Sequence, residues 1–301
     1  MFGSSTNFQY IDWWHEEIDP DSGDHAGTLS SIIPELNLNI GLTDNWNLEM
    51  ALSGGTRWMD FTGDPTSIHH RDGESVNGLG DTRITLRHLV LNESFGPGER
   101  MFIGAGLIVP SKNTLTGDPF SLGKLGSEHI HFSLSEGVYK TSVELQYFKR
   151  THSSIFYGSV LRWTTPVTQN EYGFISGSQL DISVMAYLQS KSILKGMPFL
   201  TISGLFRTPD YWNGENTPNS GASILQIGVG EIWKVGNNVV SFSVRVPIIF
   251  TSGVAAEGQG GDIDSDAKAW FGGLSIRRSF DLEKLWPEMK EEHHQMDGHD
   301  H

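Results

Sequence analysis

The residues of this chain with the clearest chemical potential are charged side chains that recur on one parity of alternating segments. In a strand, such a pattern puts charge on one face and hydrocarbon on the other. The set comprises Glu35, Glu49, Arg57, Asp81, Arg83, Arg87, Glu144, Arg162, Asp181, Arg245 and Arg277. Facing guanidinium and carboxylate groups can select small solutes at a water-filled constriction, or they can fill a narrow interior as structural ion pairs. The sequence leaves both interpretations open.

A second candidate is the carboxyl-terminal segment 281–301, which we expect to be an acidic tail outside the folded domain. It ends in EEHHQMDGHDH and holds four histidines, His293, His294, His299 and His301. Imidazoles suit zinc, copper or nickel, so this tail predicts capture of a Zn or Cu ion. The alternative is a disordered terminus whose histidines bind nothing.

Three further features could indicate a calcium site, a histidine site or an enzyme, and for each the sequence favours the interpretation without a function. Aspartates alternate within 262–266, but the central Gly and the terminal Glu of a twelve-residue calcium loop are missing. Histidines in the predicted loops, among them the pair His129 and His131, are expected to be solvated. No serine motif stands beside His88, and GxSxG and phosphate-binding Gly loops are absent. We therefore assign no catalytic residue and predict no enzyme.

The elements that must position these side chains are long amphipathic strands. The clearest example is 31–57, SIIPELNLNIGLTDNWNLEMALSGGTR, a hairpin that turns at 43–45. Its arms are longer than the roughly five or six residues of a typical soluble strand. They are close to the roughly 9–11 residues that a tilted strand needs to cross a bilayer. The pattern recurs along the chain, which predicts one domain over 1–280.

Loop lengths set the expected number of strands. Long polar loops are expected at 15–30, 58–79, 111–137, 165–177, 208–221 and 251–267, with short turns between them. This asymmetry is typical of outer-membrane barrels, and six long loops require twelve strands. The segment 128–136 also alternates, but a thirteenth strand would break the loop pattern, so we assign it to a loop or a strand extension. The predicted fold is all-β, a closed antiparallel up-and-down transmembrane β-barrel of about twelve strands.

Composition supports this class over its alternatives. Hydrophobic residues make up only 37%, and no apolar run is long enough for a transmembrane helix. A soluble β-sandwich would need shorter strands and uncharged inner faces, whereas aromatic residues, Trp46 and Trp212 among them, fall near predicted strand ends as interfacial girdles do. The net charge of −15 argues against nucleic acid as a partner. The amino terminus shows no signal peptide, so we expect a mature or truncated chain.

The segments GLGDTRITLRH (78–88) and WFGGLSIRRSF (270–280), with hairpins that have Gly-rich exits, carry a family resemblance. Over about residues 30–280 the chain resembles the outer-membrane transporter-like proteins grouped with the MetA pathway of phenol degradation. The resemblance implies a bacterial outer-membrane channel, with uptake of small aromatic compounds suggested for some members, and it implies no catalytic residues. The chain departs from this family in one respect. In most such barrels the final Phe is the last residue, whereas here twenty-one residues follow Phe280.

Together these observations predict a porin-like channel or transporter for small-molecule solutes with a charged lumen. It would lie in outer-membrane lipid with both chain ends on the periplasmic side. The alternative is a non-conducting binding barrel, whose loops or His-rich tail capture a divalent metal or a partner.

Overall fold

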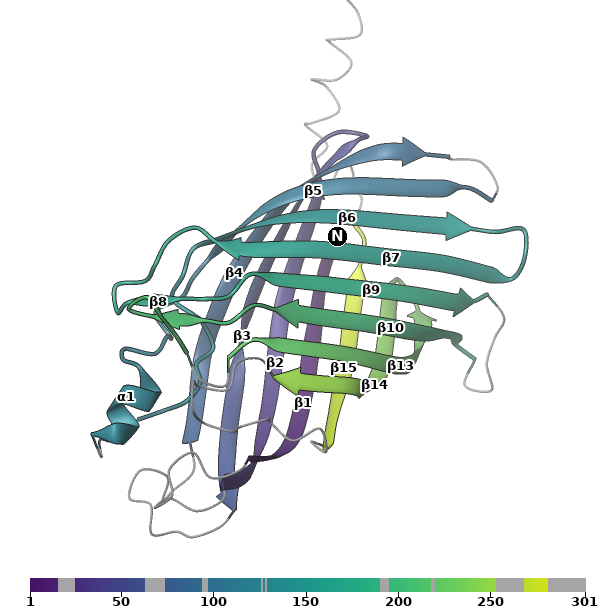
Figure 1. Ribbon diagram of the computed structural model, residues 1–301. Helices are drawn as coiled ribbons and strands as arrows, with labels where there is room; N and C mark the ends of the chain where they lie inside the picture. The colour runs from purple at the N-terminus through teal and green to yellow at the C-terminus, as the bar shows by residue number, and fades with distance from the viewer. Residues whose placement is uncertain are drawn as a thin grey trace, which may run out of the picture.

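The computed structural model describes residues 1–15, 25–62, 74–93, 97–125, 127, 129–189, 195–217, 220–252 and 268–280. Within these ranges, twelve antiparallel strands close into one barrel (Figure 1). They are β1 (Phe2–His15), β2 (His25–Gly41), β3 (Trp46–Thr62), β4 (Glu74–Asn92), β5 (Glu99–Val109), β6 (Lys140–Arg150), β7 (Ile155–Pro166), β9 (Gln179–Leu188), β10 (Met197–Arg207), β13 (Ala222–Val235), β14 (Asn238–Ser252) and β15 (Lys268–Arg278). The predicted fold class and strand number are confirmed.

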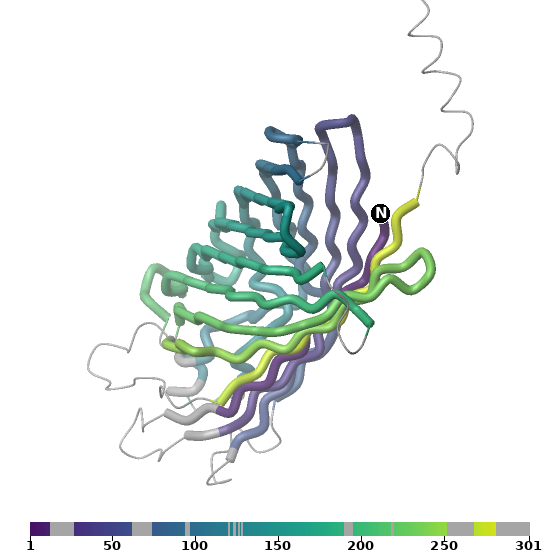
Figure 2. The backbone as a smooth tube through the Cα atoms, turned by 90° about the vertical axis from the view of Figure 1, so that its right-hand side faces the viewer, coloured from purple at the N-terminus to yellow at the C-terminus, as the bar shows by residue number. Residues whose placement is uncertain are grey.

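The barrel closes because its first and last strands pair. The order around the ring is β1-β15-β14-β13-β10-β9-β7-β6-β5-β4-β3-β2. The pairing of β1 with β15 begins at Phe2 and Arg278, and the two strands lie side by side in Figure 2, purple against yellow. Each strand thus pairs on both sides, which leaves no open sheet edge, as a sheet in lipid requires.

The barrel is apolar outside and polar inside. Apolar side chains of alternate residues stand exposed on the outer wall, for example Leu36 at 49% and Ile202 at 46%. Among the described residues only five buried side chains are hydrophobic, whereas fifteen are polar or charged. A water-soluble domain has the opposite distribution. An outer wall of this kind suits hydrocarbon, where an Arg at mid-depth would cost about 2–4 kcal/mol.

The strands extend further than the apolar alternation predicts. β1 begins at Phe2 rather than near residue 5, and β2 begins at His25, inside the predicted loop 15–30. Likewise β3 continues to Thr62 and β4 begins at Glu74, both inside the predicted loop 58–79. Backbone pairing there joins polar partners such as Thr28 and Asp60. Sheet hydrogen bonding does not require an apolar face, so strands continue beyond the stretch that hydrocarbon covers.

Short turns form one end of the barrel, which we call the turn end. In the β2–β3 turn the Thr43 hydroxyl oxygen accepts the backbone N–H groups of Asn45 and Trp46 at 3.3 and 3.1 Å. In the β13–β14 turn Gly236 has a φ of 59°, a conformation that tight hairpins demand and glycine adopts without strain.

The opposite end carries the longer connections, and we call it the loop end. The helix α1 (Pro119–Lys124) and β8 (Phe174–Ile175) lie there, away from the β6–β7 turn (Figure 1). β8 forms a small sheet with β11 (Tyr211–Trp212) and β12 (Glu215–Asn216). Trp212 is buried there beside Phe174 instead of joining an outer girdle, with ring centroids 5.1 Å apart. No helix in the described ranges has the length and apolarity of a membrane span. The described part of 128–136 contains no strand, as we assigned it.

Candidate functional site in the barrel interior

A row of opposite charges crosses five neighbouring strands on the inner wall. The register places in line Arg87 on β4, Gly104 on β5, Glu144 on β6, Arg162 on β7 and Asp181 on β9. Opposite charges on directly paired positions stabilise a register, while like charges there destabilise it. The sequence of signs along this row therefore favours the observed pairing of the strands.

Glu144 is the centre of this row. Its Oε1 accepts a hydrogen bond from Arg87 Nε at 2.5 Å, and its Oε2 accepts one from Arg162 Nε at 3.0 Å. The Glu144 side chain is only 1% exposed. A buried carboxylate is tolerated where charged donors surround it, so the two guanidinium groups hold Glu144 ionised on the inner wall.

The ion pairs continue along the wall toward β2. Arg87 Nη1 donates to Glu49 Oε2 at 2.5 Å. Arg83 Nη2 lies 3.4 Å from Glu49 Oε1 and 3.8 Å from Glu35 Oε2. The predicted residues on β2, β3, β4, β6 and β7 thus form one chain of alternating charge, which reduces the free cross-section on this side of the barrel.

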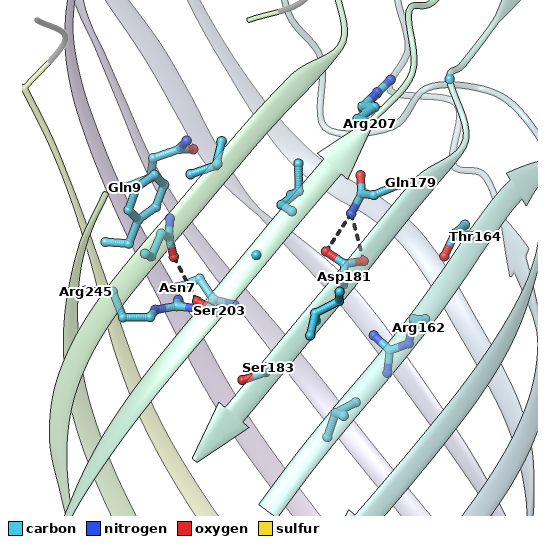
Figure 3. A pocket seen from close by; sticks show the side chains of 18 of the residues that line it. Asn7, Gln9, Arg162, Thr164, Gln179, Asp181, Ser183, Ser203, Arg207 and Arg245 are labelled. Atoms are coloured by element: carbon cyan, nitrogen blue, oxygen red, sulfur yellow. Dashed lines mark hydrogen bonds between the residues drawn. The ribbon is translucent and has the colours of Figure 1, made fainter. Parts of the chain in front are cut away.

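A cavity of about 640 Å³ lies inside the barrel beside this chain (Figure 3). Four of the predicted residues line it, Arg83, Arg162, Asp181 and Arg245. Other polar lining residues are Asn7, Gln9, Lys140, Thr164, Gln179, Ser183, Ser203, Arg207 and Gln226. The lining residues as a whole come from ten of the twelve barrel strands, all except β2 and β3, so the cavity lies within the lumen. Five cationic side chains line it, against the single carboxylate of Asp181.

Two lining residues differ in how their charge is satisfied. The Asp181 carboxylate accepts two hydrogen bonds from Gln179 Nε2, at 3.0 and 2.9 Å (Figure 3). Arg245 reaches into the cavity from β14 (Figure 3), and its Nε is buried without a hydrogen-bond partner among the described residues. Arg245 lies directly over Gly228, where a Cβ would meet its Cγ at 2.3 Å. The guanidinium is therefore a cationic group directed at the cavity.

The other three predicted lumen residues lie apart from the ion-pair chain. Arg57 Nη1 donates to the backbone carbonyl of Ser133 at 3.1 Å. Asp81 is on the same parity of β4 as Arg83, and its Oδ1 is buried. Arg277 is exposed near the turn end of β15.

The segment 129–138 lies across the loop end of the interior, which the sequence does not predict. Ser133 contacts Arg57 on β3, and Glu136 Oε1 lies 2.7 Å from Arg207 Nη1 on β10. β3 and β10 are six places apart in the ring of twelve, and so they face each other. Val138 at the end of the segment is fully buried. A loop that contacts both opposite walls narrows the lumen at that end.

Glu136 is the main ionic contact of this segment. It pairs with Lys140 as well as with Arg207. Burial alone would raise the pKa of the Glu136 carboxyl, but the charges of Arg207 and Lys140 outweigh burial and lower the pKa to about 2. The carboxylate therefore stays charged and holds the loop to β10 over the physiological pH range.

An arc of aromatic rings lines the inner wall near the turn end. It comprises Phe102, Phe148, Phe156, Tyr187 and Phe199, with successive centroids 6.4, 6.0, 5.5 and 5.4 Å apart. The rings lie over glycines of adjacent strands, since a Cβ on Gly158 would meet Phe148 Cδ1 at 3.1 Å. The sequence could have predicted this arc, because Phe148 alternates in phase with Glu144 on β6 and Tyr187 in phase with Asp181 on β9, which places both rings on the charged face.

The remaining candidates fall partly outside the described residues. His293, His294, His299 and His301 and the aspartates of 262–266 are among the residues not described. In the described part of the chain, no group of three or more His, Cys, Asp or Glu is arranged to hold a metal ion. His88 stacks on Trp46 with ring centroids 4.4 Å apart. His129 is only 9% exposed, so the expectation of a solvated loop histidine is wrong for this residue.

Comparison with known proteins supports the fold. No protein-family model and no curated protein matches the sequence. Among solved structures, the COG4313 outer membrane channel from Pseudomonas putida F1 has a TM-score of 0.62 at 14% identity, with 92% of this chain and 94% of that chain covered.

Two further structures are less similar. The KdgM porin (TM-score 0.40, 10% identity, 92% and 99% covered) and the beta domain of the Bordetella autotransporter BrkA (0.42, 11%, 93% and 99%) are too distant to carry an argument. The chain has the fold of a bacterial outer-membrane β-barrel, a fold that it shares with an outer-membrane channel.

Proposed function

We propose that this protein is an outer-membrane channel through which small solutes pass along the charged interior. The observation that carries the proposal is the cavity of about 640 Å³, which is lined by polar and charged side chains inside a wall that is apolar outside. An interior of this kind holds water, as the lumen of porins does. The proposal includes no catalytic step.

The lining favours anionic solutes. Arg83, Lys140, Arg162 and Arg207 line the cavity and each pairs with a carboxylate, so the proposed preference rests on Arg245, which has no ion pair among the described residues. Rings of basic side chains favour anions in pores. The chain of ion pairs on β2 to β7 narrows the lumen, which restricts passage to small molecules.

The aromatic arc supports the solute class that the family resemblance implies. A planar apolar solute can stack on rings such as Phe148 and Phe156, and such contacts contribute about 0.5–1.5 kcal/mol each. A small aromatic carboxylate would suit both the cationic cavity and the arc. We therefore propose small aromatic anions as solutes, in keeping with a barrel of the MetA-pathway type.

Conductance of the purified chain in planar lipid bilayers tests the channel. We expect discrete conductance steps, and a reversal potential in a salt gradient that shows preference for anions. Arg245→Ala should reduce that preference, whereas Arg278→Ala, at the turn-end terminus of β15, should leave it nearly unchanged. An absence of any conductance would contradict the channel.

The second candidate function is a non-conducting binding barrel. The segment 129–138 across the loop end favours it, because a permanent obstruction would prevent passage. In this candidate the His-rich tail captures zinc or copper. Calorimetry on the full chain, with and without alanine at His293, His294, His299 and His301, tests the tail. Equal heats of binding for the two chains would end this part of the proposal.

A further inference from the structure

Two histidines of the β5–β6 connection meet beside the first residue of β4. His129 is 9% exposed, the His131 side chain is 27% exposed, and the Glu74 side chain is 3% exposed. The group lies at the loop end, away from the charged row and the aromatic arc. These three side chains have no role in the channel proposal, although both histidines belong to the segment 129–138.

Hydrogen bonds fix the same tautomer on both imidazole rings. His129 Nδ1 lies 2.8 Å from the carbonyl oxygen of Ser127, which can only accept, so this nitrogen carries the proton. His131 Nδ1 lies 2.6 Å from Glu74 Oε1, and a carboxylate likewise accepts. In each neutral ring the lone pair is consequently on Nε2.

These two Nε2 atoms face each other at 3.2 Å. Two lone pairs at that distance repel unless a positive charge is shared between them. Two nitrogens bound to one tetrahedral zinc ion at about 2.0–2.1 Å are about 3.3 Å apart. The observed separation of the two nitrogens is close to that of two ligands of a single ion.

Glu74 supplies the usual support of such a site. Its Oε2 accepts the backbone N–H of His131 at 2.8 Å while its Oε1 bonds Nδ1 of the same residue. A carboxylate on the far nitrogen of a metal-bound histidine fixes the ring and raises its basicity as a ligand. Phe61, with its ring centroid 6.2 Å from that of His131, covers the group from β3.

We propose that His129 Nε2 and His131 Nε2 bind one transition-metal ion, with Glu74 as the positioning carboxylate. Zinc, copper(II) and nickel are the ions that imidazole prefers. The described part of the chain supplies two nitrogens to the proposed ion and no larger cluster. Both histidines belong to the segment 129–138, but the proposal does not rest on passage of solutes, so metal binding and conductance can fail separately.

The test uses the full chain in detergent, in a parent version with alanine at His293, His294, His299 and His301, so that the tail does not contribute. Calorimetry with zinc, copper(II) or nickel chloride should show a site in this parent. His129→Gln and His131→Gln should each weaken its affinity at least about tenfold, and Glu74→Gln should weaken it about 10–100-fold. His152→Gln, an exposed histidine in the β6–β7 turn, is the matched control and should not change it.

Folding of each variant is checked by heat-modifiable mobility in gels, and any one of the three variants that folds decides the proposal. For copper(II), electron paramagnetic resonance should show two imidazole nitrogens in the parent and fewer in the His129→Gln and His131→Gln chains. Parent-like affinity in the folded variants, or no metal binding by the parent, would overturn the proposal. If the parent binds no metal, the 3.2 Å contact between His129 Nε2 and His131 Nε2 is a hydrogen bond through a shared proton.

Discussion

Arg87 and Glu144 form an ion pair across an entire strand, with Arg87 Nε 2.5 Å from Glu144 Oε1, although β5 lies between their strands. The residue between them in the register is Gly104. Because glycine has no side chain, the Arg87 side chain can lie flat over β5 and reach the carboxylate. The charged row of the inner wall therefore depends on a residue that carries no charge.

Replacement of Gly104 should break this pair. A Cβ there would stand 3.2 Å from Arg87 Cγ and 3.3 Å from Thr85 Cγ2, and the further methyls of Gly104→Val have no room without moving Arg87. We expect a loss of about 1–3 kcal/mol in unfolding free energy, measured by urea titration, with an altered conductance. Ala105→Val, on the outer face of the same strand, is the control, and an equal effect of both variants would contradict the account.

Removal of the carboxylate should affect both stability and ion selectivity. Glu144→Gln leaves Arg87 and Arg162 facing each other with a neutral acceptor, so we expect a cost of about 2–3 kcal/mol and a stronger preference for anions. Unfolding titrations and reversal potentials measure the two effects. Glu99→Gln removes an exposed pair with Lys149 at the turn end and should change neither property much. Unchanged selectivity in Glu144→Gln would place the row outside the path of the ions.

Protonation of Glu136 should release the segment 129–138. The folded-state pKa of about 2 lies below the ordinary value of 4.5. The contact therefore contributes fully above about pH 4.5 and is lost as the pH falls toward 2. We expect constant conductance from neutral pH to about pH 4.5, and an increase below it.

Glu136→Gln should give the high conductance already at neutral pH, because the neutral amide cannot hold Arg207 and Lys140. Glu171→Gln, an exposed acidic residue of the β7–β9 connection, is the control. A chain with Glu136→Gln that conducts like the parent at every pH would show that the segment does not restrict flow.

The aromatic arc should bind planar solutes. A small aromatic carboxylate such as benzoate should reduce the current in a concentration-dependent way. Phe148→Ala with Phe156→Ala should raise the concentration for half-block roughly fivefold, which corresponds to about 1 kcal/mol. Phe206→Ala removes an exposed ring from the outer face of β10 and should have no effect. Equal block in both variant chains would exclude the arc as a binding surface.

The alternation of apolar and polar residues was sufficient to predict the fold, because a sheet with one apolar and one polar face produces this pattern directly. Leu36 and Leu38 against Glu35 and Asn37 predict both the strand and its faces. Strand ends were less predictable, since pairing of polar partners such as Thr28 with Asp60 has no apolar signal.

Contacts within the interior could not be read in the same way. Alternation with a period of two predicts which face of the sheet a side chain occupies. It does not predict the position of that side chain along the barrel axis relative to residues on other strands. Arg87 and Glu144 are 57 residues apart in sequence and meet only through the registers of β4, β5 and β6. The contact of Glu136 with Arg207 depends on the path of a long loop, for which the sequence has no periodic signal.

The most direct test of the central claim is the accessibility of neighbouring residues on one strand. The chain has no cysteine, so single cysteines can be introduced without background. On β10, Ser203 lines the cavity while Ile202 stands 46% exposed on the outer wall. In lipid bilayers, a charged, membrane-impermeant thiol reagent should label Ser203→Cys, and only a lipid-soluble reagent should label Ile202→Cys. Labelling of Ile202→Cys by the charged reagent, with Ser203→Cys protected, would contradict a water-filled interior within an apolar wall.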